Sequence, residues 1–323
     1  PERFTAVVDG LKKAKKPLVV VGSDMDQGGG TGPVRIGMAI NMLLDRVNKE
    51  GGMRMIPLAP PAVNGAASYD VLMQGDLVRY AADMAQDRAD RQELTDPDSF
   101  TMILLGDPQG YTKYDINQPL FDLCTAWIAD NVDHLNIKAV LCTGDLVEQN
   151  ENIVLNRKML NQTSREMWEA ASHALARLDG KVPYIVSPGN HDYGYRKAEN
   201  SRTCFPDYFP FERNPAWRDV CVATYPNRNG AISLENAAFA FDDPAWGGLL
   251  VVTTEFLPRD EVLDWAAALI DKPEYRDRKV IFMTHAFLHE RSAKRIEKNS
   301  YELTPGNTGA EIWRKLIEPS PNI

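Results

Sequence analysis

The sequence has no long run of apolar residues. The longest candidates, residues 18–21 and 249–252, have the length of strands, whereas a helix needs about 20 apolar residues to cross a bilayer. We therefore expect no membrane span. Positive charge is also scarce, because 36 Lys and Arg stand against 45 Asp and Glu, which gives a formal net charge of −9. This balance argues against general binding to nucleic acid or to anionic membranes.

Cysteine is sparse, and its four copies form no metal-binding pattern, with neither a Cys-x-x-Cys pair nor a His at ligand spacing. We interpret Cys142, inside an apolar strand, and Cys124, on a helix, as buried thiols. Cys204 and Cys221 lie in an irregular, proline-rich segment and could form a disulfide in an exported protein. Together with a first residue that is Pro1 rather than Met, this pair favours export, periplasmic or secreted, over a cytoplasmic location.

What remains is an ordinary globular composition, 44% hydrophobic and 25% charged. Single domains mostly have about 100–200 residues, so a chain of 323 residues is expected to form two units. We place the first unit at residues 1–92 and the second at 99–323. The linker between them, residues 93–98, lies in a stretch crowded with Asp, Arg, Glu, Thr and Pro.

The sequence of the first unit predicts a small N-terminal βαβ segment. Strands are expected at residues 17–21 and 53–58, and helices at 34–49 and 70–86. The glycine-rich loop 28–32 lacks both common phosphate-binding patterns, Gly-x-x-x-x-Gly-Lys-Ser/Thr and Gly-x-Gly-x-x-Gly, so we interpret it as a connection.

This order of elements, with Gly-Ser-Asp-Met-Asp at residues 22–26 and Ala-Pro-Pro at 59–61, resembles the middle of an SGNH-type hydrolase. The segment lacks the Ser nucleophile block and the closing Asp-x-x-His of that family. We assign no catalysis to it, and an SGNH-type esterase activity stays as an alternative.

In the second unit, strands alternate with helices, which is typical of an α/β fold. Single strands are expected at residues 101–105, 137–142, 182–186 and 279–283, and a strand pair at 231–241 and 249–256. Helices are expected at residues 119–131, 159–178, 259–270 and 309–317. Residues 196–227, rich in Pro, aromatic and charged side chains, predict an inserted rim loop.

Four of these strands end in residues suited to metal binding or proton transfer. The strand ends carry Gly106-Asp107-Pro108-Gln109, Gly144-Asp145, Gly189-Asn190-His191-Asp192 and Thr284-His285. Open α/β sheets bind ligands at the carboxyl ends of their strands. Because adjacent strands lie about 4.8 Å apart, donors at these ends can converge on two ions roughly 3.5–4 Å apart.

These motifs, in this order and spacing, resemble the calcineurin-like metallophosphoesterases, in the branch whose first motif is Asp-Pro-Gln rather than Asp-x-His. The resemblance covers roughly residues 99–323. It implies an α/β fold in which a sandwich of sheets is flanked by helices. It also implies a phosphatase or phosphodiesterase, that is, a hydrolase for phosphate esters with a dinuclear metal site.

The resemblance also implies a ligand set. Asp107 would bind the first metal, Asp145 would bridge both, and Asn190 and His285 would bind the second. Gln109 stands where many relatives have a histidine ligand, and its amide oxygen is a weaker, harder donor. The two divalent ions could be Mn, Fe, Zn, Mg or Ca, and Gln109 makes Mn, Mg or Ca more plausible at the first site relative to Zn.

Two further residues are implied in catalysis. His191 would face the phosphate and protonate or stabilise the leaving oxygen, and the Glu148 carboxylate would orient His191. A metal-bridging hydroxide would then attack phosphorus in line with the leaving group. The expected substrate is a small phosphorylated molecule, a phosphomonoester or a phosphodiester, with a phosphoprotein or a nucleotide as candidates.

Relatives close the site with a Gly-His-x-His segment after one further strand. The five histidines, at 134, 173, 191, 285 and 289, do not have that spacing. We expect the sequence to be a C-terminally truncated piece of a longer polypeptide. The alternative is a catalytically degenerate binding protein on the same fold.

Overall fold

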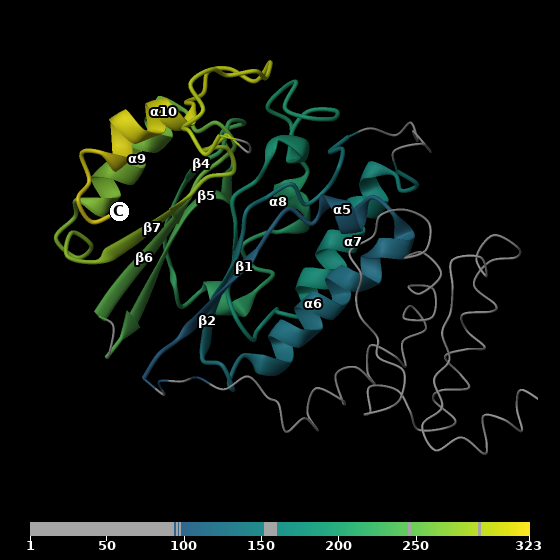
Figure 1. Ribbon diagram of the computed structural model, residues 1–323, viewed down its shortest axis with the longest axis horizontal. Coiled ribbons are helices and arrows are strands. Elements are labelled where there is room, and N and C mark those ends of the chain that lie inside the picture. Colours follow the sequence, from purple (N-terminus) through teal and green to yellow (C-terminus); the bar gives the residue numbers. More distant parts are fainter. Residues whose placement is uncertain (1–93, 95, 97, 152–159, 245–246, 290–291) are drawn as a thin grey trace, which may run out of the picture. The chain divides into compact units, whose positions relative to one another are not determined.

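The computed structural model describes residues 94, 96, 98–151, 160–244, 247–289 and 292–323 (Figure 1). The N-terminal segment 1–92 and its SGNH-like motifs lie outside the described residues, as does much of the linker at 93–98. The second unit is described in nearly its full expected extent.

The first sheet consists of three parallel strands in the order β1-β2-β3. They are β1 (Thr101–Leu105), β2 (Ile137–Cys142) and β3 (Tyr184–Val186). The sequence-based bounds of the first two are confirmed, and the third is shorter than expected at its start. Leu105 lies opposite Cys142, and Cys142 opposite Val186. The three strands therefore end level with one another, and the chain segments that follow them leave the sheet at the same edge.

The second sheet is mixed, with the order β4-β5-β6-β7. Its strands are β4 (Cys221–Pro226), β5 (Ile232–Asp243), β6 (Gly247–Thr253) and β7 (Lys279–Met283). The pairing of β5 with β6 is antiparallel and that of β6 with β7 is parallel. The strand pair and β7 are confirmed. The prediction of a loop through 196–227 is wrong at its end, because β4 pairs there with β5.

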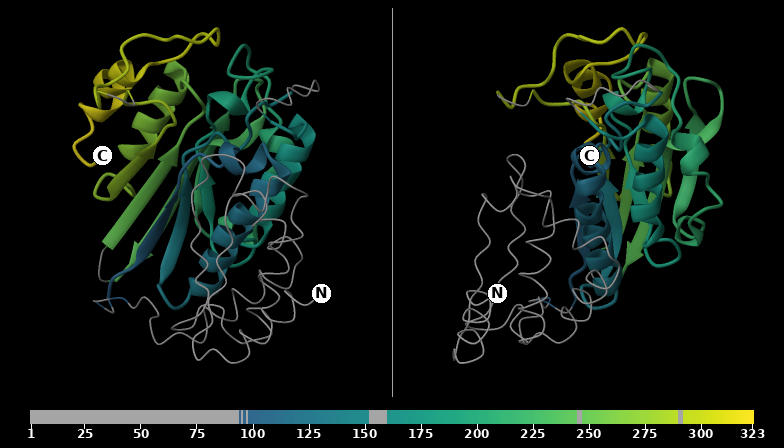
Figure 2. Two further views of the ribbon diagram at one scale, coloured as in Figure 1. Left: turned by 45° about the vertical axis from the view of Figure 1, so that its right-hand side comes forward. Right: turned by 90° about the vertical axis from the view of Figure 1, so that its right-hand side faces the viewer.

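Helices cover the outer faces of both sheets, so the described unit is a sandwich of two sheets between helical layers (Figures 1 and 2). The first sheet is covered by α6 (Gln118–Asn131) and α7 (Ser164–Ala176). The second is covered by α9 (Asp260–Ile270) and by α10 (Gly309–Ile312), which continues as a π-helix, Trp313–Ile317. Short helical turns complete the chain: α5 (Gln109–Thr112), η2 (Asp115–Asn117), η3 (Asn190–Asp192), α8 (Phe205–Tyr208) and η4 (Pro215–Trp217).

Successive side chains along the strands of the second sheet point to opposite faces, so they pack in two different cores. Ala237, Phe239 and Val251 pack in the core shared with the first sheet, whereas Ala238 and Val252 pack beneath α9 and the C-terminal helices. Such alternation follows from the two-residue repeat of a strand. A mixed α/β sheet sandwich flanked by helices is therefore confirmed as the fold class.

The cysteines differ in part from their sequence interpretation. Cys142 is buried, as expected, but Cys124 is exposed, because Phe121 and Ile128 form the inward face of α6. The four cysteines are free thiols, so the disulfide that Cys204 and Cys221 could form in an exported protein is not present. Export stays a prediction. In the part of the chain that the structure describes, no helix is long and apolar enough to span a membrane.

Candidate metal centre

Three of the predicted ligands meet at one point. Single ligand atoms from Asp107, Asp145 and His285 lie within 4.8 Å of one another. Asp107 follows β1, Asp145 follows β2 and His285 follows β7. The centre therefore lies where the carboxyl ends of strands from both sheets come together, which is the expected position for a ligand site in an open α/β sheet.

Asp145 belongs to this cluster and is only 3% exposed. Its Oδ1 accepts a hydrogen bond of 2.8 Å from the main-chain N–H of His191, and its carbonyl accepts one of 2.8 Å from the N–H of Gln109. The segments after β1, β2 and β3 are thus joined through one residue. Burial raises the pKa of Asp145, while positive charge on His285 and His191 lowers it. A cation at this point would favour the ionised carboxylate.

His285 is held by its Nδ1 atom, which lies 2.6 Å from the carbonyl oxygen of Thr143. A carbonyl can only accept, so Nδ1 carries the proton and the neutral ring has a lone pair on Nε2. That Nε2 lies 3.2 Å from Oδ1 of Asn190 and 3.5 Å from Oδ2 of Asp145. Three atoms with lone pairs therefore face one another. This arrangement is unfavourable for a neutral ring unless a cation lies among them.

Asp107 and Gln109 both follow the end of β1. Oδ1 of Asp107 accepts a hydrogen bond of 2.9 Å from the hydroxyl of Thr143. The Oε1 atom of Gln109 is buried and has no hydrogen-bond partner among the described residues. An unpaired buried amide oxygen costs free energy, and coordination to a hard cation would satisfy it.

These features are what a divalent metal site requires. The donors are carboxylate oxygens, amide oxygens and one imidazole nitrogen, a set that suits Mn, Mg, Ca or Fe and is compatible with Zn. The hydrogen bond that Thr143 donates to Asp107 and the one that it accepts from His285 are of the kind that orients metal ligands in proteins. The residues present therefore fit a bound divalent ion.

His191 lies beside this cluster, and its Nδ1 is 2.7 Å from the main-chain carbonyl oxygen of Glu148. We expected the Glu148 carboxylate to orient His191. In the structure the carbonyl makes that contact, and the carboxylate lies 2.9 Å from Nζ of Lys113. Because a carbonyl can only accept, Nδ1 of His191 carries the proton of this hydrogen bond. The Nε2 atom takes no part in it. Glu148 therefore holds His191 through its backbone, and its side chain forms a partly buried ion pair.

Two residues beside the centre had no role assigned from sequence. Thr143 bonds Asp107 through its hydroxyl and His285 through its carbonyl. Asp192 is fully buried, and its carboxylate accepts hydrogen bonds from the N–H groups of Gly189, Leu146 and Val147. Burial raises the pKa of Asp192 well above its usual value, and these N–H bonds lower it. The Gly-Asn-His-Asp motif contained the signal for Asp192, whereas Thr143 is one of many threonines.

Comparison with known proteins agrees with this geometry. The family model described as calcineurin-like phosphoesterase matches residues 100–311, which is more than half of the chain. The chain belongs to the calcineurin-like phosphoesterase family. The matched range contains every candidate residue of the centre. Membership supports a metallophosphoesterase type of function, and the Asp107, Asp145 and His285 group agrees with the metal dependence typical of the family.

Two curated relatives are similar over part of their length. The uncharacterized protein YvnB of Bacillus subtilis is 28% identical over 234 residues, which cover 70% of this chain. The menaquinone reductase, molybdopterin-binding-like subunit of Nitratidesulfovibrio vulgaris is 44% identical over 86 residues, or 27% of this chain. The chain covers 15% of the first relative and 12% of the second.

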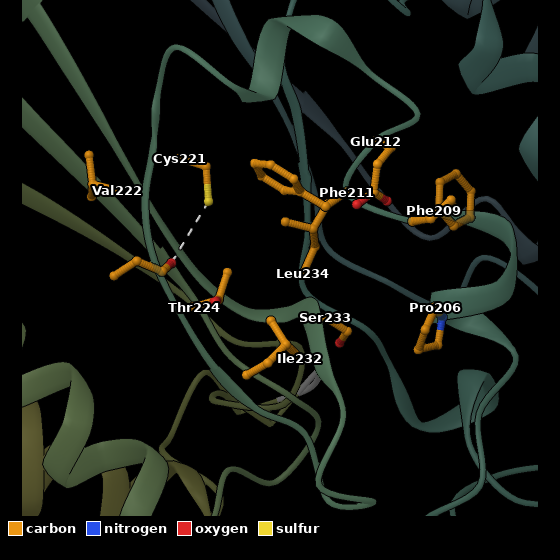
Figure 3. A pocket seen from close by; sticks show the side chains of 12 residues that line it. Pro206, Phe209, Phe211, Glu212, Cys221, Val222, Thr224, Ile232, Ser233 and Leu234 are labelled. Carbon is orange, nitrogen blue, oxygen red and sulfur yellow. Dashed lines mark hydrogen bonds between the residues drawn. The ribbon is translucent and has the colours of Figure 1, made fainter.

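A surface hollow of about 540 Å³ in this calcineurin-like phosphoesterase is separate from the centre (Figure 3). It lies beside β4 and the start of β5, and Phe211, Val222 and Ile232 are among the side chains that line it. None of the candidate ligands lines this hollow. We therefore do not assign it to phosphate chemistry.

Proposed function

We propose that the protein hydrolyses a phosphomonoester or a phosphodiester at a site that holds two divalent metal ions. The observation that carries the proposal is the convergence of donor atoms from Asp107, Asp145 and His285 within 4.8 Å. Family membership supports the same class of reaction. The substrate is a small phosphorylated molecule, with a phosphoprotein or a nucleotide as candidates.

Five side chains would hold the ions. Asp107 and Gln109 bind the first ion, Asp145 contributes to both, and Asn190 and His285 bind the second. The unpaired Oε1 of Gln109 supports its inclusion, and the 3.2 Å approach of His285 Nε2 to Asn190 Oδ1 supports the second group. Since an amide oxygen is a harder donor than imidazole, we propose Mn, Mg or Ca rather than Zn at the first position.

Bound divalent cations would neutralise the charge of the phosphate and lower the pKa of the water that attacks phosphorus. His191 then supplies a proton to the leaving oxygen. Its Nδ1 stays bonded to the Glu148 carbonyl, so a protonated ring has its transferable proton on Nε2. General acid catalysis of this kind contributes about 10²–10⁴ to the rate.

The ligands keep their orientation through neighbouring groups of the chain. Thr143 fixes one oxygen of Asp107 with its hydroxyl and leaves the other oxygen available. The Thr143 carbonyl keeps the proton of His285 on Nδ1, so that Nε2 can donate its lone pair. Asp192 ties the turn that carries Asn190 to the segment after β2.

The test is hydrolysis of p-nitrophenyl phosphate and bis-p-nitrophenyl phosphate with added Mn²⁺, by the wild type and by Asp145→Asn. We expect turnover that a chelator removes and that Asp145→Asn abolishes. Metal-free protein without turnover on either substrate would favour the degenerate binding protein. Hydrolysis of an acetyl ester that survives the chelator would instead favour an esterase activity of residues 1–92.

A further inference from the structure

The short segment around Tyr301 is fixed by one asparagine. Oδ1 of Asn299 accepts a hydrogen bond of 2.8 Å from the Tyr301 N–H, and its Nδ2 donates one of 3.0 Å to the Leu303 carbonyl. The Leu303 side chain is buried, and the Leu303 N–H donates to the carbonyl of Ala198 at 3.0 Å. The main chain at Tyr301 is thus held from both sides, which limits where its side chain can point.

The ring of Tyr301 is one aromatic ring away from the metal centre. It meets the buried Phe256 at 90°, with 5.0 Å between centroids. Phe256 in turn contacts the imidazole of His285, with 5.9 Å between centroids. Tyr301 therefore belongs to the cluster of side chains that packs behind the second group of ligands.

The hydroxyl of Tyr301 is available for a ligand. Tyr301 is half-buried, and no described residue forms a hydrogen bond with its hydroxyl. Burial raises the pKa of Tyr301, and the negative charge of Asp145 raises it further. The phenol therefore stays protonated at neutral pH. A protonated hydroxyl without a partner beside an anion site is a hydrogen-bond donor for that anion.

We propose that the Tyr301 hydroxyl donates a hydrogen bond to a non-bridging phosphate oxygen of the substrate at the centre formed by Asp145 and His285. The proposal rests on the phosphoesterase function proposed above and adds a substrate contact to it. Tyr301 serves to bind and orient the phosphate, and His191 remains the group that protonates the leaving oxygen. The same hydroxyl would contact inorganic phosphate as a product or inhibitor.

Tyr301→Phe tests the contact because it removes the hydroxyl and keeps the ring against Phe256. Tyr275→Phe is the matched control. Tyr275 is also half-buried. It precedes β7, which begins at Lys279, whereas His285 follows the other end of this strand. Measurements are kcat/KM for p-nitrophenyl phosphate, the inhibition constant of inorganic phosphate, Mn²⁺ binding and the melting temperature.

We expect Tyr301→Phe to lower kcat/KM about tenfold or more and to weaken phosphate inhibition by a similar factor, since a hydrogen bond to a charged group is lost. Mn²⁺ binding and melting temperature should match the wild type, and Tyr275→Phe should change none of the four. Wild-type kcat/KM and phosphate inhibition in Tyr301→Phe would overturn the proposal. An equal loss in Tyr275→Phe would also overturn it.

Asp145→Asn, assayed in parallel, separates this proposal from the one on which it rests. An inactive Asp145→Asn with an unimpaired Tyr301→Phe refutes the Tyr301 contact alone. Full activity of Asp145→Asn refutes the centre at Asp145 and the contact with it. A wild type without metal-dependent turnover refutes the phosphoesterase function as well.

Discussion

Gly189 and Asp145 approach each other so closely that no side chain fits between them. A Cβ atom on residue 189 would lie 2.2 Å from Oδ1 of Asp145 and 2.6 Å from its main-chain nitrogen. Real Cβ atoms do not come so near to such atoms. The glycine of the Gly-Asn-His-Asp motif is therefore required because the central carboxylate occupies the space where its side chain would be.

Gly189→Ala should displace Asp145 or the turn at residues 190–192. We expect a loss of roughly 2 kcal/mol or more in the free energy of unfolding, as for overpacked core positions, together with weaker Mn²⁺ binding. Gly110→Ala is the control, because a Cβ there meets nothing within 4 Å. Urea unfolding and metal titration measure both effects. If Gly189→Ala keeps the wild-type stability and Mn²⁺ binding, the segments that carry Gly189 and Asp145 can move apart without cost.

Glu148→Gln tests which atom of Glu148 holds His191. The substitution removes the charge that pairs with Lys113 but keeps the main-chain carbonyl, which is the group 2.7 Å from Nδ1 of His191. Partly exposed ion pairs contribute at most about 1 kcal/mol, so we expect less than a tenfold loss of kcat. His191→Ala should lose about 10²–10⁴. Equal losses of kcat in the two variants would show that the Glu148 carboxylate orients His191.

Gln109→Leu tests whether the buried amide oxygen is a metal ligand. The substitution replaces the unpaired Oε1 by apolar atoms of similar size. Removing an unsatisfied buried acceptor should leave the stability of the metal-free protein equal or higher. We expect the number of tightly bound Mn²⁺ ions to fall from two to one in equilibrium dialysis. Gln162→Leu, at a glutamine whose amide bonds Asn161, is the control and should keep both ions. Two ions in Gln109→Leu would remove Gln109 from the ligand set.

Glu235 makes the stability of the fold depend on pH. Burial raises the pKa of its carboxyl, although hydrogen bonds from Tyr193, Ser233 and Asn227 lower it. A raised native pKa means that the folded state binds more protons than the unfolded state, so stability declines as pH rises from about 4.3, the unfolded value, through the native value.

Comparing the wild type with Glu235→Gln isolates this effect. We expect the wild-type free energy of unfolding, relative to the variant, to fall as pH rises from about 4 to 7, by at most about 1.4 kcal/mol per pH unit. Urea unfolding of both proteins at one Mn²⁺ concentration measures it. If the free energies of unfolding of the two proteins run parallel with pH, or if the wild type gains stability relative to the variant as pH rises, the three hydrogen bonds outweigh burial.

Much of this fold could be predicted because its strands are short apolar runs that end in Gly and polar residues. The strands at 101–105, 137–142 and 279–283 have their predicted bounds for that reason. The strand β4 was missed because it follows a proline-rich segment and is only half-buried. Cys124 was wrongly predicted to be buried, since it shares an apolar character with Phe121 on the same helix but is exposed.

For three residues of the candidate site, the sequence predicted the grouping but not the atoms that make the contacts. Motif spacing indicated that Asp107, Asp145 and His285 would come together. Spacing cannot distinguish a side chain from a main-chain carbonyl, which is why the contact of Glu148 with His191 differs from expectation. Tyr301 lies in a polar stretch without a motif. Only the packing of its ring against Phe256 indicates that it belongs near the site.

We propose that the carboxyl ends of β1, β2, β3 and β7 bind divalent ions that serve phosphate-ester hydrolysis. Anomalous diffraction from Mn²⁺-soaked crystals of the wild type and of Asp145→Asn tests it most directly. We expect two peaks in the wild type, one beside Asp107 and Gln109 and one beside Asn190 and His285, both within reach of Asp145. At least one peak should be lost in the variant. A wild-type map without a peak at these residues would contradict it.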